Sequence, residues 1–387
     1  MISPLQQANH FIHRCAVNMD ELQSLAHKVV EVIDHTTSGD TFSSENFNTL
    51  ALELADAQRR TNPVLDAYWK QTARHPWTHW RQIPPLPVNA FKHYDITAIP
   101  PKARTCVFHS SGTTGQKRSC HWHHEESLRV YRHALKAWFA RHLLNKEDSS
   151  PKPEWLMFSL TPLPTEAPHS SLVFMLNAVI EQWGAPNSRF LGYTNKNNDW
   201  MLDTGVAVSL LEKTVQQGTP VILLGTAFNF VHLLDELIRL NKVVPLPSGS
   251  RLMETGGYKG RSRSIPVDEL HQALSKHLGI PRNHVVREYG MCELSSQAYD
   301  RIAGTPPAEP TRFVFPPWVK TRIISPETGM DCQPGEPGLL CIYDLANIWS
   351  VMAVQTADLA IGDENGFELL GRASSAEPRG CSLMVKE

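Results

Sequence analysis

The feature that most constrains the fold is an alternation, between about residues 102 and 310, of short apolar runs with longer amphipathic stretches. Apolar runs of strand length occupy residues 155–160, 221–224 and 284–286, and apolar residues recur at helical spacing in residues 125–144, 205–217, 229–241 and 267–278. Strands that alternate with helices bury their faces under those helices. The alternation therefore predicts an α/β fold, with β-sheets covered by helices.

Two helical patterns are the clearest. In residues 125–144 one stripe contains Leu128, Tyr131, Leu135, Trp138, Phe139 and His142, whereas Arg129, Arg132 and Lys136 lie off it. Residues 20–75 are also helical in pattern, because a start signal at residues 43–45 precedes Phe47, Leu50, Ala51, Leu54 and Ala55 at helical spacing. We assign no chemistry to this N-terminal segment.

Proline and glycine divide the chain. Prolines interrupt residues 76–101 and predict an extended connector. After about residue 311, short β patterns at 313–315, 319–324, 338–343 and 367–370 alternate with Pro and Gly turns, which predicts a smaller β subdomain. We expect a helical N-terminal region with its connector (1–101), an α/β core (102–310), the β subdomain (311–370) and a C-terminal tail (371–387).

Composition excludes several classes of protein. Of 387 residues, 41% are hydrophobic and 20% charged, which is typical of globular proteins. The net charge of −2 provides no positive field for nucleic acid, and no run approaches the roughly 18 apolar residues of a membrane span. Seven scattered cysteines without a CxxC pair indicate reduced thiols, as expected in the cytoplasm.

A loop rich in hydroxyl groups follows the apolar stub at residues 106–108. Residues 109–119 read His-Ser-Ser-Gly-Thr-Thr-Gly-Gln-Lys-Arg-Ser, and glycine lets backbone N–H groups approach phosphate oxygens while Ser and Thr add donors. The loop is not a Walker A motif, because only two residues separate Gly112 from Gly115 and Gln116 precedes the lysine. It predicts a polyphosphate site, with a solvated Ser/Gly linker as the alternative.

Two further strings have residue types suited to nucleotide binding. Residues 287–293, Arg-Glu-Tyr-Gly-Met-Cys-Glu, follow an apolar strand, so that Tyr289 can stack on a base and Glu293 can be an oxygen ligand for Mg²⁺. Residues 355–359, Gln-Thr-Ala-Asp-Leu, precede Gly371-Arg372, and a ribose can be held between the Asp358 carboxylate and the Arg372 guanidinium.

In this order the strings resemble the signatures SSGTTG, YGxTE, TGD and GR of the adenylate-forming superfamily of acyl and aryl ligases. The chain looks most like its acyl-protein synthetase branch, the LuxE-like proteins of the bacterial luminescence fatty-acid reductase system. The branch likeness runs from about residue 105 to the end, through residues 253–260, 289–299, 316–318, 344–347 and 379–383. It implies the N-terminal domain of an adenylate-forming ligase.

The resemblance implies roles for individual residues. The ATP phosphates would be held by Ser110, Ser111, Gly112, Thr113, Thr114 and Gly115 with Lys117 or Arg118. The adenine and acyl pockets would be lined by Gly256, Gly257, Tyr258 and Tyr289, in a motif that includes Gly290 and Cys292. Glu293 would bind Mg²⁺, Asp358 and Arg372 would hold the ribose, and His169 stands where the superfamily often has a residue that gates the pocket.

The chain departs from the superfamily pattern at several points. Cys292 replaces the usual Thr, Ala357 replaces the usual Gly, and Gln116-Lys117-Arg118 stands where many ligases have Pro-Lys. Only 15 residues of the sequence follow Arg372, so we expect it to lack the usual mobile C-terminal domain of about a hundred residues, as the resembling acyl-protein synthetases do. These departures bear on affinity more than on the class of reaction.

Cys381 is the candidate for the second half-reaction. A thiolate can attack an acyl adenylate to give a thioester, and the nearby Arg379 favours the thiolate form. A C-terminal tail is also free to swing toward a partner. The alternative is a small buried cysteine with no chemistry.

Three other features have open alternatives. Residues 120–124, Cys-His-Trp-His-His, suggest a metal site, but neighbouring residues cannot all face one ion, so a histidine near the phosphates is the better interpretation. His169 either gates the pocket or caps a helix that begins at Ser170. The stripe Leu172, Val173, Met175, Leu176 and Val179 is core, an acyl tunnel, or both.

We therefore expect a cytoplasmic acyl-protein synthetase dependent on ATP and Mg²⁺. It would activate a carboxylic acid, most plainly a fatty acid, as acyl-AMP, capture the acyl group on Cys381 and pass it to a partner acyl-CoA reductase-type protein. The alternatives are a CoA or aryl ligase that uses a free thiol, and a nucleotide-binding pseudoenzyme subunit.

Overall fold

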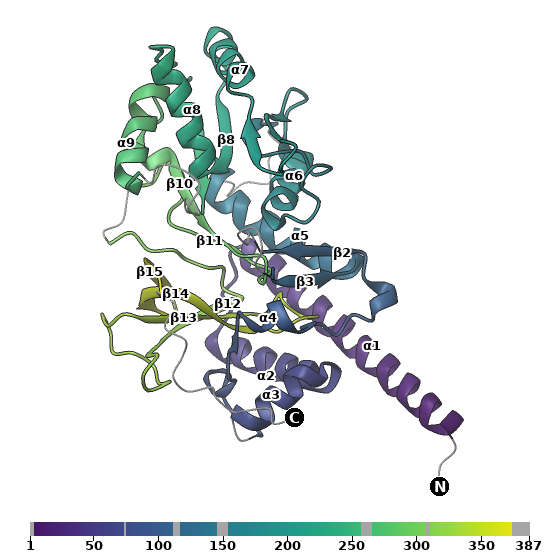
Figure 1. The fold of residues 1–387 in the computed structure, drawn as a ribbon. Coiled ribbons are helices and arrows are strands. Elements are labelled where there is room, and N and C mark those ends of the chain that lie inside the picture. The colour runs from purple at the N-terminus through teal and green to yellow at the C-terminus, as the bar shows by residue number, and fades with distance from the viewer. Residues whose placement is uncertain are drawn as a thin grey trace.

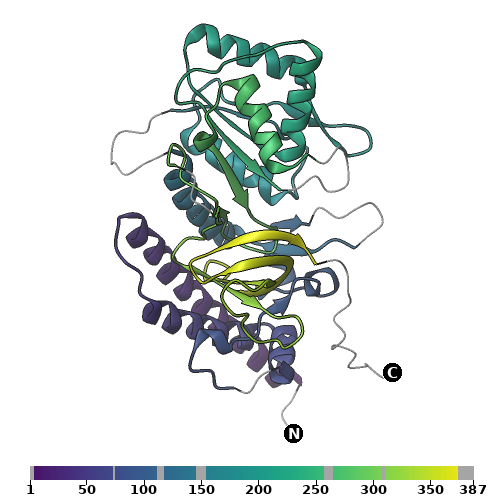
Figure 2. The ribbon, with the colours of Figure 1, turned by 90° about the vertical axis from the view of Figure 1, so that its left-hand side faces the viewer.

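The structure is a computed structural model that describes residues 4–72, 75–110, 117–144, 154–256, 265–306 and 310–373, with side chains from residue 19 onward. Figures 1 and 2 show an upper lobe built on a six-stranded sheet and a lower lobe in which a five-stranded sheet packs against the N-terminal helices.

The upper sheet has the strand order β11-β10-β9-β8-β4-β5. Its strands are β4 (Leu156–Ser159), β5 (Arg189–Phe190), β8 (Val221–Thr226), β9 (Arg251–Thr255), β10 (Val285–Tyr289) and β11 (Ala298–Tyr299). All pairs are parallel except that of β10 with β11. The carboxyl ends of the parallel strands therefore share one edge, where α/β proteins place their ligands.

Helices cover both faces of this sheet. One face carries α5 (Glu125–Phe139), whose last turn widens into a π-helix (Ala140–Leu144), and α6 (Ser171–Trp183). The other carries α7 (Thr204–Gln217), α8 (Ala227–Arg239) and α9 (Val267–Leu278), with a 3₁₀ turn (Arg282–His284) before β10. Along β8, Ile222 and Leu224 pack toward α5 and α6, whereas Val221 and Leu223 pack toward α7, α8 and α9. The predicted helix-covered α/β fold is confirmed.

The lower sheet has the order β1-β14-β13-β12, and β15 pairs with the C-terminal part of β14, beyond the residues that pair with β1. Its strands are β1 (Leu86–Pro87), β12 (Val319–Ile324), β13 (Gly338–Asp344), β14 (Ala353–Asp363) and β15 (Gly366–Arg372). β1 is parallel to β14 and the other pairs are antiparallel.

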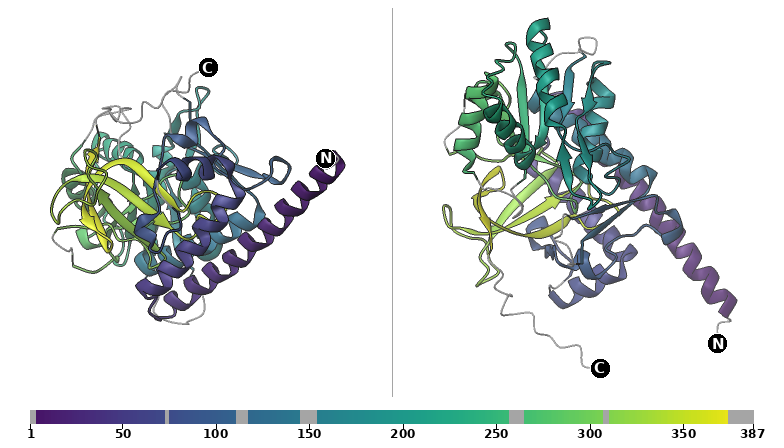
Figure 3. Two further views of the ribbon diagram at one scale, coloured as in Figure 1. Left: turned by 90° about the horizontal axis from the view of Figure 1, so that it is seen from below. Right: turned by 45° about the horizontal axis from the view of Figure 1, so that its top comes forward.

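The N-terminal helices are α1 (Pro4–Thr37), α2 (Ser44–Thr61), α3 (Pro63–Thr72) and the short α4 (Ala90–His93), with 3₁₀ turns at Trp80–Gln82 and Pro101–Ala103. The N-terminal part of α1 projects away from the rest of the molecule (Figure 3). The Ser43 side chain accepts the Asn46 N–H and caps α2, as the start signal predicts. Phe47, Leu54 and the rest of the predicted stripe are buried in one core with the lower sheet, so this core crosses the predicted boundary at residue 101.

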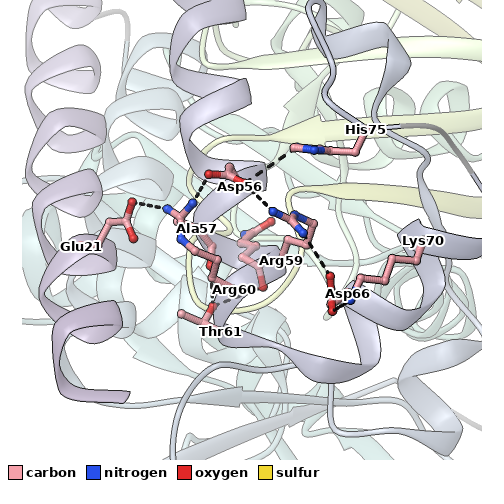
Figure 4. A network of polar contacts seen from close by, with 10 residues as sticks. Glu21, Asp56, Ala57, Arg59, Arg60, Thr61, Asp66, Lys70 and His75 are labelled. Atoms are coloured by element: carbon pink, nitrogen blue, oxygen red, sulfur yellow. Dashed lines mark hydrogen bonds and ion pairs between the residues drawn. The ribbon is translucent and has the colours of Figure 1, made fainter. Parts of the chain in front are cut away.

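Charged side chains connect α1, α2 and α3 at the surface (Figure 4). Arg60 pairs with Glu21 and Asp56, and Arg59 pairs with Asp56 at 3.1 Å and with Asp66 at 3.4 Å. Burial raises the pKa of Asp56, but hydrogen bonds and charge from Arg59 and Arg60 outweigh burial and hold the pKa below its usual value. Exposed pairs of this kind contribute little each to stability.

Two hairpins lie outside the sheets. β2 (Cys106–His109) pairs with β3 (Cys120–His123), and β6 (Gly192–Thr194) pairs with β7 (Trp200–Leu202). The first hairpin carries the phosphate-loop motif between its strands.

Three expectations need correction. Residues 313–315 form isolated bridges, Phe313 to Phe367 and Val314 to Tyr299, rather than a strand. The connector at 76–101 contains β1 and α4 and is not uniformly extended. β14, at 11 residues the longest strand of the lower sheet, was not predicted, because its alanines and polar residues give no apolar run. The domain boundaries themselves stay a prediction.

In the described part of the chain no helix is long and apolar enough to cross a membrane.

Candidate functional site

The β2–β3 hairpin forms the base of the predicted phosphate loop. His109 pairs with Cys120 at its end, and the Ser110 hydroxyl accepts the Ser119 N–H at 2.9 Å. Residues 111–116 lie outside the described residues, so the expected roles of Ser111, Gly112, Thr113, Thr114 and Gly115 remain predictions. Lys117 and Arg118 are exposed where the chain returns, which leaves both cations accessible to an anion.

His169 lies beside this loop. Its carbonyl accepts the His109 N–H at 2.9 Å, its Nδ1 lies 3.1 Å from the Val107 carbonyl, and its ring centre is 4.8 Å from that of His109. Burial lowers the pKa of His109. Capping of α6 by His169 is wrong, because the Ser170 side chain accepts the Val173 N–H at 3.2 Å and is the N-cap.

The histidines of β3 serve contacts inside the protein. His121 Nδ1 donates to the Cys292 carbonyl at 2.7 Å, and burial lowers the pKa of His121 to about 4. His123 Nδ1 lies 3.2 Å from the Ser127 hydroxyl, and burial holds the pKa of His123 well below its usual value. Both rings are therefore neutral at pH 7 and both are buried. Within the described residues no three His, Cys, Asp or Glu side chains could together hold a metal ion.

Glu293 lies in a buried loop, residues 292–297, between β10 and β11. The residue is 3% exposed, and among the described residues no hydrogen bond or ion pair reaches its carboxylate. A single carboxylate together with substrate phosphates suits Mg²⁺. The residue present therefore fits the expected ion. Cys292 is buried beside it, where the usual motif has a threonine hydroxyl.

Tyr289, Asp358 and Arg372 come together at the end of β10 and on β14 and β15. The Tyr289 hydroxyl donates to Asp358 Oδ2 at 2.8 Å, and Arg372 Nε lies 3.4 Å from Asp358 Oδ1. Asp358 and Arg372 are paired residues of neighbouring strands, so strand register holds them side by side. Burial, and then the charge of Asp358, hold the pKa of Tyr289 well above its usual range. The hydroxyl therefore remains a donor, and the buried carboxylate faces a guanidinium whose side chain is 82% exposed.

The glycines of the motifs lie at the ends of β9 and β10. Gly256 ends β9 with a φ of 71°, in the left-handed region that favours glycine. A Cβ on Gly290 would meet the Glu288 carboxylate, so a larger residue there would displace that side chain. Gly257 and Tyr258 lie outside the described residues.

Glu288 is a site residue that the motif reading missed. It is 6% exposed, accepts a hydrogen bond from the Thr255 hydroxyl and lies against Gly290. Burial raises the pKa of Glu288 to about 7, and the charge of Glu254 adds to this against the Thr255 hydrogen bond. The sequence did contain a signal for Glu288, because an acidic residue stands among the apolar residues of the buried strand β10.

Two remaining predictions have different outcomes. Cys381 lies outside the described residues, so its acyl-accepting role remains a prediction. In the α6 stripe, Val173, Met175, Leu176 and Val179 are buried core residues, and Leu172 is partly buried against them.

Two hydrogen bonds join the three signature segments. His121, on the hairpin of the phosphate loop, holds Cys292 next to Glu293, and Tyr289 holds Asp358. The base of the phosphate-loop hairpin with two accessible cations, a buried loop that carries Glu293 and an acid–guanidinium pair therefore lie near the carboxyl edge of the upper sheet. Such an arrangement can bind polyphosphate, a divalent ion and the hydroxyl groups of a sugar.

Solved structures show the fold. An open conformation of 2-hydroxyisobutyryl-CoA ligase, in complex with 2-HIB-AMP and CoA, matches with a TM-score of 0.60 and 12% identity over 86% of this chain and 71% of that chain. The same ligase in its thioesterification state matches with a TM-score of 0.60 and 14% identity, over 87% and 70%. The fold is that of adenylate-forming ligases.

ATP-bound MatB from Rhodopseudomonas palustris matches with a TM-score of 0.46 and 15% identity over 72% of this chain, a score too low to bear on the fold. The chain spans only 48% of MatB. No curated protein matches the sequence. Residues 78–387, however, match the family described as acyl-protein synthetase, LuxE. The chain therefore belongs to the LuxE family of acyl-protein synthetases.

Proposed function

We propose that the protein activates a carboxylic acid with ATP and transfers the acyl group to a thiol of its own chain. The observation that carries this proposal is the linkage of the three signature segments: His121 to the Cys292 carbonyl at 2.7 Å, and Tyr289 to Asp358 at 2.8 Å. Membership of the LuxE family supports the same reaction class.

In the first half-reaction, a carboxylate oxygen of the acid attacks the α-phosphorus of ATP. The bond from that phosphorus to the bridging oxygen breaks, pyrophosphate leaves and acyl-AMP remains. Lys117 and Arg118 would bind the phosphates, while Asp358 would accept hydrogen bonds from the ribose. Glu293, together with the phosphates, would hold Mg²⁺, and the bound ion would supply positive charge next to the departing pyrophosphate.

In the second half-reaction, the thiolate of Cys381 attacks the acyl carbonyl carbon, and AMP leaves as the thioester forms. The acyl group, which we propose to be a fatty acyl group, then passes to a partner acyl-CoA reductase-type protein. His169 lies beside the phosphate loop, with its ring centre 4.8 Å from that of His109, and would contact the acyl adenylate.

The test replaces one atom, the sulfur of Cys381, and so separates acyl-AMP formation from transfer of the acyl group to the protein. Cys381→Ser should retain pyrophosphate exchange and acyl-AMP formation but lose thiol-sensitive labelling of the protein by radioactive acyl groups. Cys332→Ser is the matched control, because Cys332 is a half-buried thiol at the edge of the lower sheet. Equal labelling of Cys381→Ser and wild type would refute the acceptor, and label transfer to free CoA instead would favour a CoA or aryl ligase.

A further inference from the structure

The loop that carries Glu293 has no regular secondary structure, yet residues 292–297 are all buried. Its conformation therefore depends on side chains from other elements. Asn347, in the turn between β13 and β14, provides the most direct contact: its Nδ2 donates to the Glu293 carbonyl at 2.9 Å and to the Val351 carbonyl at 2.8 Å. Its Oδ1 accepts the Ser295 hydroxyl at 3.3 Å, so Asn347 holds the loop on both sides of Leu294.

Neighbouring contacts hold the rest of this loop. Asp344 accepts the Ser295 N–H at 2.9 Å and the Ser296 hydroxyl at 2.8 Å, and the Trp318 indole donates to Ser296 at 3.1 Å. Gln297 donates to the Tyr131 hydroxyl at 3.2 Å. Among the described residues, Asn347 is the one whose side chain hydrogen-bonds to the backbone of Glu293 itself.

Asn347 is in turn held by a residue of the N-terminal helices. Gln58 on α2 is 1% exposed, and its Nε2 donates to the carbonyls of Asn347 at 2.8 Å and Ile348 at 3.0 Å. Its Oε1 accepts the Met352 N–H at 3.1 Å. A single amide therefore satisfies three buried backbone groups and fixes the turn that contains Asn347. Gln58 precedes the family match, which begins at residue 78.

We propose that Gln58 is a positioning residue for the reaction: it acts through Asn347 to hold the Glu293 carboxylate where a divalent ion and nucleotide phosphates bind. This inference rests on the proposed function. It gives the N-terminal helices a direct part in the geometry of the site.

The experiment compares two variants of α2. Gln58→Met keeps the side-chain volume and removes all three hydrogen bonds. Asn48→Leu is the matched control, because Asn48 also holds backbone groups of a following segment, the Trp80 N–H at 2.7 Å and the Thr78 carbonyl at 3.3 Å, without contacting the turn at 344–352. Asn347→Asp removes both donated bonds, retains the acceptor for Ser295 and tests the second link should Gln58→Met not fold.

The readout is the Mg²⁺ concentration that gives half-maximal binding of a non-hydrolysable ATP analogue, measured by calorimetry, together with Tm. We expect an increase of about 10- to 100-fold for Asn347→Asp, as for partners of metal ligands, and of about two- to thirtyfold for Gln58→Met. Asn48→Leu should lower Tm and leave the midpoint unchanged. Hydrogen exchange should also be faster in residues 292–297 of Gln58→Met, but not of Asn48→Leu.

Two failures are distinguishable. The proposed function fails if wild type shows neither Mg²⁺-dependent binding of the ATP analogue nor ATP–pyrophosphate exchange with any carboxylic acid. The inference itself is overturned if wild type binds the ATP analogue and Gln58→Met has the same Mg²⁺ midpoint and the same rate of hydrogen exchange in residues 292–297. Gln58 is then only structural.

Discussion

Replacing Tyr289 by Phe removes one oxygen from the site and tests whether Asp358 needs a fixed orientation. The hydroxyl donates to Asp358 Oδ2 at 2.8 Å, while the ring contacts Phe313 and Phe367 at centroid distances of 5.9 and 5.2 Å. Phe can keep the ring contacts, so the change leaves little cavity. Within the described part of the chain, the Asp358 carboxylate then keeps only the weak contact to Arg372 through Oδ1.

The magnitude follows from the kind of bond that is lost. A hydrogen bond to a charged group contributes about 1.5–3 kcal/mol, and about 1.4 kcal/mol corresponds to a tenfold change in an equilibrium constant. The exposed Arg372 pair replaces little of this, because surface ion pairs contribute about 0–1 kcal/mol. We therefore expect the KM for ATP to rise about tenfold or more, with kcat changed less, since the ribose is remote from the reacting carboxylate.

The assay is pyrophosphate exchange at varied ATP and saturating acid. Tyr343→Phe is the matched control, because the Tyr343 hydroxyl donates to the Ile83 carbonyl at 3.0 Å, in the lower lobe and away from Asp358. It should lower Tm without raising the KM for ATP. An unchanged KM in Tyr289→Phe would show that the orientation of Asp358 does not matter for nucleotide binding and would refute this reasoning.

Three further predictions concern carboxylates. Glu293→Gln should keep the fold, because the replacement is nearly isosteric, yet reduce Mg²⁺-dependent adenylation about a hundredfold; wild-type exchange rates would contradict the assignment. Asp358→Ala should raise the KM for ATP and leave acid specificity unchanged, and an equal KM would place the nucleotide elsewhere. The pKa of Glu288 is raised to about 7 in the folded state, so wild type should lose up to about 3 kcal/mol of unfolding free energy relative to Glu288→Gln as pH rises from about 4.5 to 7. Denaturant titrations of both proteins at pH 5 and pH 8 measure this difference, and parallel pH profiles would contradict it.

The sequence predicted the parts of the fold that local periodicity determines. The α5 stripe is buried along its whole length, including His142, because a helix that covers a sheet must present one continuous apolar face. β4, β8 and β10 were predictable because strands buried on both faces are nearly continuous apolar runs. The motifs identified Asp358 and Arg372, which strand register then brings together.

Other parts depend on contacts between distant segments, which periodicity does not report. β14 pairs with strands on both sides, so the sheet rather than an apolar run makes it a strand. Gln58 and Asn347 are 289 residues apart in the sequence. Nothing in the pattern of α2 distinguishes a glutamine that holds a remote turn from a polar residue at the margin of an apolar stripe. The raised pKa of Glu288 likewise depends on its burial, which the sequence pattern does not report.

The most direct test of the central claim is ATP–pyrophosphate exchange by the wild-type protein across a panel of carboxylic acids, with and without Mg²⁺. The panel should include straight-chain fatty acids of several lengths, aromatic acids and short hydroxy acids. We predict exchange that requires both Mg²⁺ and an acid and is fastest with a fatty acid. If the protein binds ATP but shows no exchange with any acid, acid activation is contradicted. The protein would then be a nucleotide-binding subunit that does not catalyse this reaction.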